Sequence, residues 1–244
     1  MQAKTQPQNR VEPHELEWTG DRVRDFWDYY SGNPALTDIY FSKQAGRSLL
    51  RYVRGKIRIG EALDIGCGGG DLIGYLLERG IAARGADQSP ASVERVNARF
   101  AGKPRFGGAV VGTEKVPDAS VDTAFILEVV EHLNDAMLNE VLDEARRTLR
   151  PGGHLVVTTP NEEVLAANNV FCPGCGSTFH RMQHVRAWSA ETLSAAAAEH
   201  GFSAVSAEGI ALSPFTGWRD LMWRNAYPAL MKKRPNLVYI GRKG

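Results

Sequence analysis

An α/β fold with an open, mostly parallel sheet is predicted for this 244-residue chain by three features of its sequence. The first is residues 61–71, EALDIGCGGGD, where a short apolar strand (62–65) breaks into glycines and an apolar helix follows. The second is Asp87, which ends the next apolar stretch about 20 residues beyond the glycines. The third is the helix stop LRPGG (149–153) before another apolar strand. Units of strand, turn and helix in this order build open α/β sheets.

The other elements follow from apolar spacing and turn residues. Residues 1–16 have little apolar content and are expected to be disordered. Residues 17–55 are expected to form a helical cap, since Val23, Phe26, Trp27 and Tyr30 recur at helical spacing. Residues 56–244 then form the main domain. We expect strands at 82–86, 106–111, 123–127, 155–158, 202–210 and 237–240, and helices at 42–53, 134–149, 189–200 and, as a lid, about 214–232.

Composition and charge exclude several classes of function. The net charge of +1 gives no overall attraction to nucleic acid, so nucleic-acid binding is not expected. No apolar run approaches the length of a membrane span, and the polar N-terminus lacks the hydrophobic region of a signal peptide. Three cysteines, two of them in a Cys-x-x-Cys, indicate a reducing compartment. We therefore expect a cytoplasmic protein, either a monomer or a homodimer.

The residues around the glycines indicate which ligand the turn binds. A dinucleotide site has the pattern G-x-G-x-x-G, but the third glycine would fall at Asp71. Asp64 and Asp71 flank the glycines, and carboxylates on both sides disfavour a pyrophosphate and suit the ammonium of an amino-acid end. The stretch DIGCGGGD resembles the first motif of the class I S-adenosylmethionine-dependent methyltransferases. Asp87 and LRPGG follow in the same order as in that class. A dehydrogenase is therefore the weaker interpretation.

The resemblance implies a fold and a set of cofactor-binding residues. The fold is a Rossmann-like seven-stranded sheet, mostly parallel with an antiparallel last strand, in the order 3-2-1-4-5-7-6. S-adenosylmethionine is the implied cofactor and S-adenosylhomocysteine its product. Position 112, where the family has an acid that meets the adenine, is glycine here. The implied cofactor-binding residues are Asp64, Gly66, Cys67, Gly68, Asp87, Gln88, Thr113 and Glu128.

An inserted stretch at about 168–188 carries a pattern of metal ligands. Cys172, Cys175, His180 and His184 are spaced C-x₂-C-x₄-H-x₃-H, which supplies four ligands for tetrahedral zinc. A redox-active Cys-x-x-Cys is an alternative, but the glycines beside the cysteines do not suit the helix start of a thioredoxin motif. The histidines could also face the substrate, as in many small-molecule methyltransferases that the chain resembles.

A second candidate metal site is the segment E-x-x-E-H, formed by Glu128, Glu131 and His132. Some methyltransferases that the chain resembles use such a segment, with one more histidine, to hold a divalent metal such as magnesium near the acceptor hydroxyl. Acids at a helix start are also a purely structural feature. The pattern favours structural zinc over no metal, and both over a catalytic divalent cation. Glu131, His132 and His184 are the candidate proton acceptors for an oxygen nucleophile.

The predicted function is S-adenosylmethionine-dependent O-methylation of a small-molecule acceptor such as a quinone, a glycan or a natural-product intermediate. The resemblance is nearest to ubiquinone-type O-methyltransferases. Two alternatives remain open: an RNA methyltransferase that uses the Cys/His segment, and a non-catalytic S-adenosylmethionine-binding protein.

Overall fold

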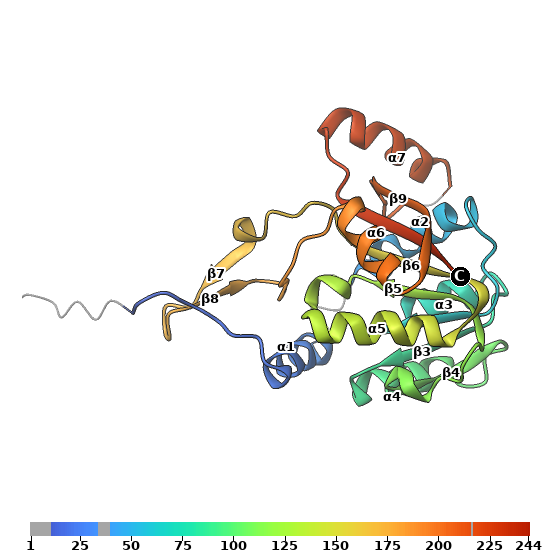
Figure 1. Ribbon diagram of the computed structural model, residues 1–244, viewed down its shortest axis with the longest axis horizontal. Helices are drawn as coiled ribbons and strands as arrows, with labels where there is room; N and C mark the ends of the chain where they lie inside the picture. The colour runs from blue at the N-terminus through green and yellow to red at the C-terminus, as the bar shows by residue number, and fades with distance from the viewer. Residues whose placement is uncertain (1–10, 34–39, 216) are drawn as a thin grey trace, which may run out of the picture.

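A seven-stranded sheet runs through the protein in the order β4-β3-β2-β5-β6-β10-β9. The computed structural model describes residues 11–33, 40–215 and 217–244 (Figure 1). The first five strands of that order are parallel, and β10 runs antiparallel to both β6 and β9. The predicted strand order and antiparallel end strand are therefore confirmed. The strands are β2 (Ala62–Ile65), β3 (Ala83–Asp87), β4 (Phe106–Val111), β5 (Val121–Leu127), β6 (Leu149–Pro160), β9 (Phe202–Ile210) and β10 (Asn236–Lys243).

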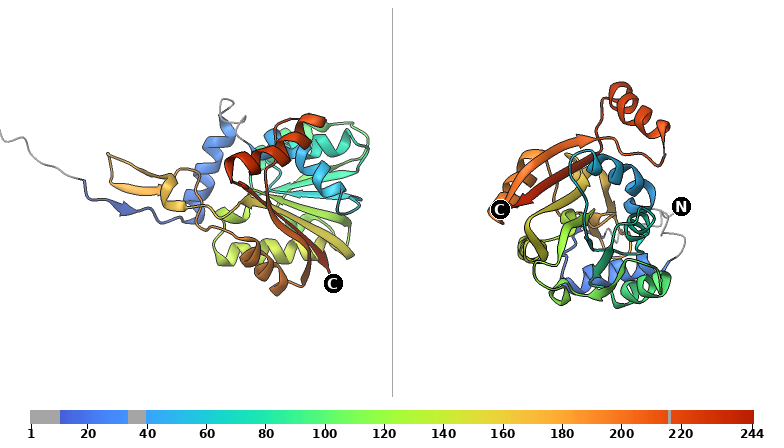
Figure 2. Two further views of the ribbon diagram at one scale, coloured as in Figure 1. Left: turned by 90° about the horizontal axis from the view of Figure 1, so that it is seen from above. Right: turned by 90° about the vertical axis from the view of Figure 1, so that its right-hand side faces the viewer.

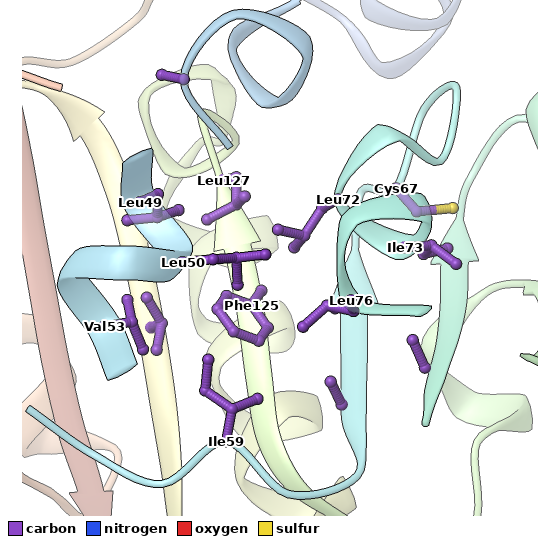
Figure 3. Packing of buried hydrophobic residues seen from close by; sticks show 14 of the residues in the cluster. Leu49, Leu50, Val53, Ile59, Cys67, Leu72, Ile73, Leu76, Phe125 and Leu127 are labelled. Atoms are coloured by element: carbon purple, nitrogen blue, oxygen red, sulfur yellow. The ribbon is translucent and has the colours of Figure 1, made fainter. Parts of the chain in front are cut away.

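Helices cover both faces of the sheet because the buried strands are apolar on both sides. On one face, α2 (Phe41–Arg54), α3 (Asp71–Leu77) and α4 (Pro90–Phe100) pack over Phe125 and its neighbours. Figure 3 shows Phe125 between Leu50 of α2 and Leu76 of α3. On the other face, α5 (Asp135–Thr148) and α6 (Ala190–Glu199) cover Ile126 and Tyr239. Consecutive residues of β5 thus enter opposite halves of the core.

The LRPGG stretch was expected to be a turn, but in the structure it is part of a strand. Residues 149–153 form the first part of β6, because Leu149 pairs with Val121. The register shifts between Val121 and Thr123, where β6 bulges. A β-carbon at Gly153 would lie 2.9 Å from the carbonyl of Arg150, so the bulge requires glycine. The helix does end at this point, but the chain continues directly into the strand.

A small second sheet projects from the domain (Figure 2). The hairpin of β7 (Asn169–Phe171) and β8 (Ser177–His180) is joined by β1 (His14–Glu15), which runs parallel to β8. The disorder predicted for 1–16 falls, for residues 1–10, outside the described part of the chain. At residues 14–15 the structure differs from that prediction, because β8 offers β1 an edge with free backbone groups.

Two helices lie outside the main layers. Helix α1 (Gly20–Gly32) begins at Thr19, whose hydroxyl accepts from the amide of Arg22, and it lies beside the small sheet. Helix α7 (Trp218–Met231) connects β9 to β10 and stands away from the body. Across the described ranges, every helix is too short or too polar to cross a bilayer. The predicted roles of 17–55 as a cap and of 214–232 as a lid stay predictions.

Candidate functional site

The glycine turn lies at the carboxyl edge of the sheet, where ligands bind in open α/β folds. The amide of Gly66 donates to the carbonyl of Ala86 at 2.8 Å, which holds the turn against β3. Gly66 has φ +76°, and a β-carbon there would lie 2.7 Å from Cγ2 of Val129, so only glycine fits. Gly68 has φ +49°, and within the described residues no atom lies within 4 Å of the place of its β-carbon. A ligand can therefore lie directly on the main chain at Gly68.

Acidic side chains surround this turn. Asp64 is only 2% exposed. Burial, and then the charges of Asp87 and Asp71, raise the pKa of Asp64 to about 8. Asp71 forms an ion pair with Arg99 at 2.9 Å, so its charge is compensated within the protein. A cationic group bound at the turn would therefore favour the ionised form of Asp64 in particular.

Asp87 connects the end of β3 to the glycine turn. Its Oδ2 accepts from the amide of Gly68, and its Oδ1 accepts from the amide of Ser89, both at 2.9 Å. Burial raises the pKa of Asp87, while these two hydrogen bonds lower it in part. Each oxygen keeps a further lone pair. The carboxylate can therefore accept from two neighbouring hydroxyls, as a ribose diol requires.

Three other residues expected to bind the cofactor differ in how far their side chains are buried. The Cys67 thiol is buried, and it packs against Gly85 beside Ile73 (Figure 3). Cys67 can therefore meet a ligand only through its backbone. Gln88 is exposed. Thr113 is buried, and its carbonyl accepts from Arg147 at 2.9 Å.

Glu114 supplies an acid beside the glycine at position 112. Gly112 has φ +81°, and the carboxylate of Glu114 occupies the space that a side chain at 112 would need. A carboxylate thus lies beside position 112 although residue 112 itself is glycine. Sequence reasoning overlooked Glu114 because the positive φ that brings it back over Gly112 is not visible in a motif.

The segment after β5 begins with a strained residue. Glu128 has φ +53°, a conformation that costs a non-glycine residue roughly 1–3 kcal/mol and is often found at functional sites. Burial, more than the carboxylate of Glu163, raises the pKa of Glu128 to about 7. Its Oε1 is buried without a hydrogen-bond partner among the described residues.

Glu131 and His132 follow in a short 3₁₀ turn, and both are buried. Oε2 of Glu131 accepts from the hydroxyl of Thr159 at 3.0 Å, whereas Oε1 finds no partner in the described ranges. Burial, and then Glu128, raise the pKa of Glu131. Burial, and then His184, lower the pKa of His132 to about 3, so its ring is neutral. Its Nδ1 lies 3.4 Å from the carbonyl of Gln183 and donates to it, so Nε2 carries a lone pair.

The two histidines of the insert differ in what they offer. Nδ1 of His180 accepts from the amides of Met182 and His184, at 3.3 and 3.2 Å. Its proton therefore sits on Nε2, which faces Glu163 at 3.2 Å. His180 is thus a poor metal ligand. His184 directs Nδ1 at the other oxygen of Glu163, at 2.5 Å, and so keeps the lone pair of Nε2 available.

Glu131 and His132 lie close to His184 in space, although about fifty residues separate this pair from His184 in sequence. Their ligand atoms lie within 4.8 Å of one another. Nε2 of His132 and Oε1 of Glu131, 3.8 Å apart, both present lone pairs. Lone pairs that converge in a buried site require a proton or a cation between them. The trio of Glu131, His132 and His184 can therefore hold a divalent cation or accept a proton.

The structure does not assemble the four ligands of the predicted zinc knuckle. Cys172 and Cys175 lie at the turn of the hairpin, whereas His180 ends β8, about 10 Å along the strand. Neither thiol belongs to a group of three candidate ligands within the described ranges. The sulfur of Cys175 instead hydrogen-bonds with the hydroxyl of Ser177 at 3.2 Å. The pKa of Cys175 is lowered because Ser177 can donate to the thiolate.

Replacing both cysteines with serine is therefore expected to leave the protein folded. We expect Cys172→Ser with Cys175→Ser to change the melting temperature by less than about 4 °C, the shift that roughly 1 kcal/mol would cause. Zinc content by elemental analysis should also be unchanged. Loss of one equivalent of zinc together with a large fall in melting temperature would instead support the predicted zinc knuckle.

Helix α1 covers the trio from one side. The indole ring of Trp27 lies edge-on to His132, with 4.7 Å between ring centroids. Its Nε1 donates to the side chain of Gln183 at 3.0 Å, and Gln183 donates to the carbonyl of His132 at 3.0 Å. Gln183 is fully buried with φ +60°. The N-terminal helix and the insert thus meet over His132.

The profile of a family described as a methyltransferase domain matches residues 39–207. This match covers the glycine turn, Asp87, the trio and the insert. The chain belongs to this methyltransferase family.

Individual relatives agree with the methyltransferase family. The chain is 29% identical over 161 residues to a ubiquinone biosynthesis O-methyltransferase of Paracidovorax citrulli, an alignment that covers 64% of this chain and 65% of that protein. It is 39% identical over 106 residues to a probable S-adenosylmethionine-dependent methyltransferase of Mycolicibacterium smegmatis, covering 41% of this chain and 38% of the relative. The chain thus spans less than two thirds of both relatives.

Solved structures show the same methyltransferase fold. A 1,6-didemethyltoxoflavin-N1-methyltransferase from Burkholderia thailandensis, with S-adenosylhomocysteine bound, superposes with a TM-score of 0.62 at 16% identity, covering 95% of this chain and 93% of that one. A methyltransferase from Mesorhizobium loti gives 0.59 at 20% identity, covering 81% and 99%. At these identities, the superpositions show that the chain shares the fold of these methyltransferases.

Sequence reasoning also missed Glu163 and Gln183 of this methyltransferase. Both orient histidines of the trio, Glu163 through Nδ1 of His184 and Gln183 through Nδ1 of His132. Neither residue lies in a recognisable motif. Only the contact between the insert and the end of β5 reveals their roles.

Proposed function

We propose that this methyltransferase methylates a hydroxyl oxygen of a small-molecule acceptor at the trio of Glu131, His132 and His184. The observation that carries the proposal is the convergence of three lone-pair-bearing groups beside the glycine turn. Val129, which lies within this segment, contacts Gly66 directly. The O-methyltransferase names of several relatives support an oxygen acceptor.

The cofactor end of the site fits S-adenosylmethionine. When bound, it supplies a methyl group already made electrophilic by the sulfonium. Asp64 would balance the ammonium, and Gly66, Cys67 and Gly68 would offer backbone contacts. Asp87 and Gln88 would bind the ribose. Thr113 and Glu114 would lie near the adenine, and Glu128 would stand between the cofactor and the acceptor.

We propose further that the trio binds a divalent cation. The unpartnered Oε1 of Glu131 and the fixed tautomers of His132 and His184 fit such an ion. Two imidazoles and one carboxylate suit zinc or manganese better than magnesium, which prefers oxygen ligands. Bound there, the cation would lower the pKa of a coordinated hydroxyl. Residues of the chain then position that hydroxyl in line with the methyl group.

Removal of metal tests this proposal. The assay measures S-adenosylhomocysteine formed with a panel of catechols and hydroxylated quinone precursors. We expect chelation to lower the rate about 10²–10⁴-fold, and zinc or manganese to restore it. Full activity in metal-free protein would contradict the cation and leave His184, oriented by Glu163, as the proton acceptor.

The geometry of the site supports neither alternative function, an RNA methyltransferase or a non-catalytic S-adenosylmethionine-binding protein. An RNA methyltransferase would need a basic surface leading to the glycine turn, whereas the side chains there are acidic. A non-catalytic role would be favoured if no acceptor class yielded S-adenosylhomocysteine while the cofactor still bound.

A further inference from the structure

Helix α7 exposes large apolar side chains. Trp218 is 67% exposed and Leu230 is 80% exposed, and Leu221, Met222 and Met231 are each more than half exposed. Side chains along one side of the helix line an open groove of about 630 Å³, among them Phe215, Trp218, Met222, Trp223, Tyr227 and Leu230. Such a patch on a soluble domain marks an interaction surface.

The contact between α7 and the body leaves this apolar side free. Asp220 is the buried residue of the helix, and it accepts from the hydroxyls of Ser48 and Ser213 and pairs with Arg51 at 2.5 Å. Arg224 lies over the ring of Tyr52. The helix is thus attached through a buried acid and the part-buried side chains around it, which leaves Trp218, Met222 and Leu230 without cover from the body.

Positive charge is concentrated beside the apolar groove. Residues 214–235 contain five basic residues and one acid, Asp220, which is buried and paired. Since the whole chain has a net charge of only +1, the remainder is net negative. Lys232, Lys233 and Arg234 follow the helix directly and are exposed. An occupant of this face must therefore be both apolar and anionic.

We propose that α7 and residues 232–234 dock this enzyme onto an anionic lipid surface. Fourteen residues span about 21 Å, which is too short to cross a bilayer but suits a helix lying in its interface. Tryptophan and tyrosine favour that interface, and lysine and arginine bind anionic headgroups. A second copy of the chain is disfavoured as occupant, because two such faces would repel each other.

The experiment is co-sedimentation of the full chain with phosphatidylcholine vesicles, with and without phosphatidylglycerol. We expect binding only when phosphatidylglycerol is present. Lys232→Glu with Lys233→Glu should weaken that binding about 30-fold or more, since each lysine near an anionic surface contributes about 1 kcal/mol. Trp218→Ser with Leu230→Ser should also weaken it, because both side chains are exposed and would enter the interface.

The matched control is Lys103→Glu with Arg105→Glu, an equal charge change in the exposed loop before β4, at the opposite edge of the sheet. Control and test variants should bind S-adenosylhomocysteine like wild type. No sedimentation with anionic vesicles would overturn the proposal. Equal loss of binding in the control, or a dimer that Leu230→Ser dissociates, would also overturn it. None of these outcomes depends on the proposed acceptor chemistry.

Discussion

Glu131→Gln is expected to lower the methyl-transfer rate about 10²–10⁴-fold, the range for losing a group that activates a nucleophile. Glutamine keeps the size of the side chain and the contact with Thr159, but it cannot carry the negative charge that a cation or a protonated histidine requires. Cofactor affinity should be nearly unchanged, because Glu131 lies beyond the glycine turn.

The melting temperature separates this effect from misfolding. Burial raises the pKa of Glu131, so the ionised carboxylate destabilises the cation-free fold. We therefore expect the variant to be at least as stable as wild type. Glu140→Gln, an exposed glutamate on α5, is the matched control and should keep full activity. A Glu131→Gln enzyme of normal rate would remove the trio from the mechanism.

Asp64→Asn is expected to weaken S-adenosylmethionine binding about 10–150-fold. This is the range that about 1.5–3 kcal/mol for a hydrogen bond to a charged group implies. Wild-type affinity should fall as pH falls through about 8, because the bound cation favours ionised Asp64. The asparagine variant should lose this pH dependence. Calorimetry at several pH values measures both effects.

Without cofactor, the same substitution should stabilise the protein. The folded-state pKa of Asp64, about 8, lies above its ordinary value of 3.8, so ionisation costs folding free energy. Protonated Asp64 contributes fully to the free energy of unfolding below pH 3.8. This contribution is lost as the pH rises to about 8. Asp64→Asn should therefore melt higher than wild type near pH 8, with little difference near pH 4.

Asp71→Asn serves as the control in the same turn. Since Arg99 already compensates Asp71, this change should affect cofactor affinity much less. Wild-type affinity in Asp64→Asn, or tight binding of a nicotinamide dinucleotide, would contradict the role of the acids in choosing the cofactor.

The sequence predicted those parts of the protein that local patterns determine. The strand β2, its glycines and the acid at the end of β3 are close in sequence, and they carried the family resemblance that implied the order of the sheet. Strands β4 and β9 have the predicted bounds because apolar runs end at turn residues. The bulge at Gly153 was missed because proline and glycine can interrupt a strand as well as end a helix.

The trio of Glu131, His132 and His184 was only partly predictable because it depends on contacts between distant segments. Spacing grouped His180 and His184 with the cysteines, whereas the hairpin directs the histidines toward Glu163 and Glu131. Two backbone amides decide the tautomer of His180, and no motif records them. Likewise, a net charge of +1 concealed the basic end of α7, because charge balance over a whole chain says nothing about its distribution.

The pairing of β1 with β8 fixes an order of events during synthesis. Residues 14–15 leave the ribosome early, yet their partner strand is made more than 160 residues later. At a translation rate of about 5–20 residues per second, the N-terminal segment waits roughly ten seconds or more for residues 177–178. Helix α1 can contact Gln183 only after the same delay, so His132 is covered only after the five parallel strands β2 to β6 have been made. Slow or paused translation within the insert would therefore prolong a stage in which the five parallel strands are present but Trp27 does not yet cover His132.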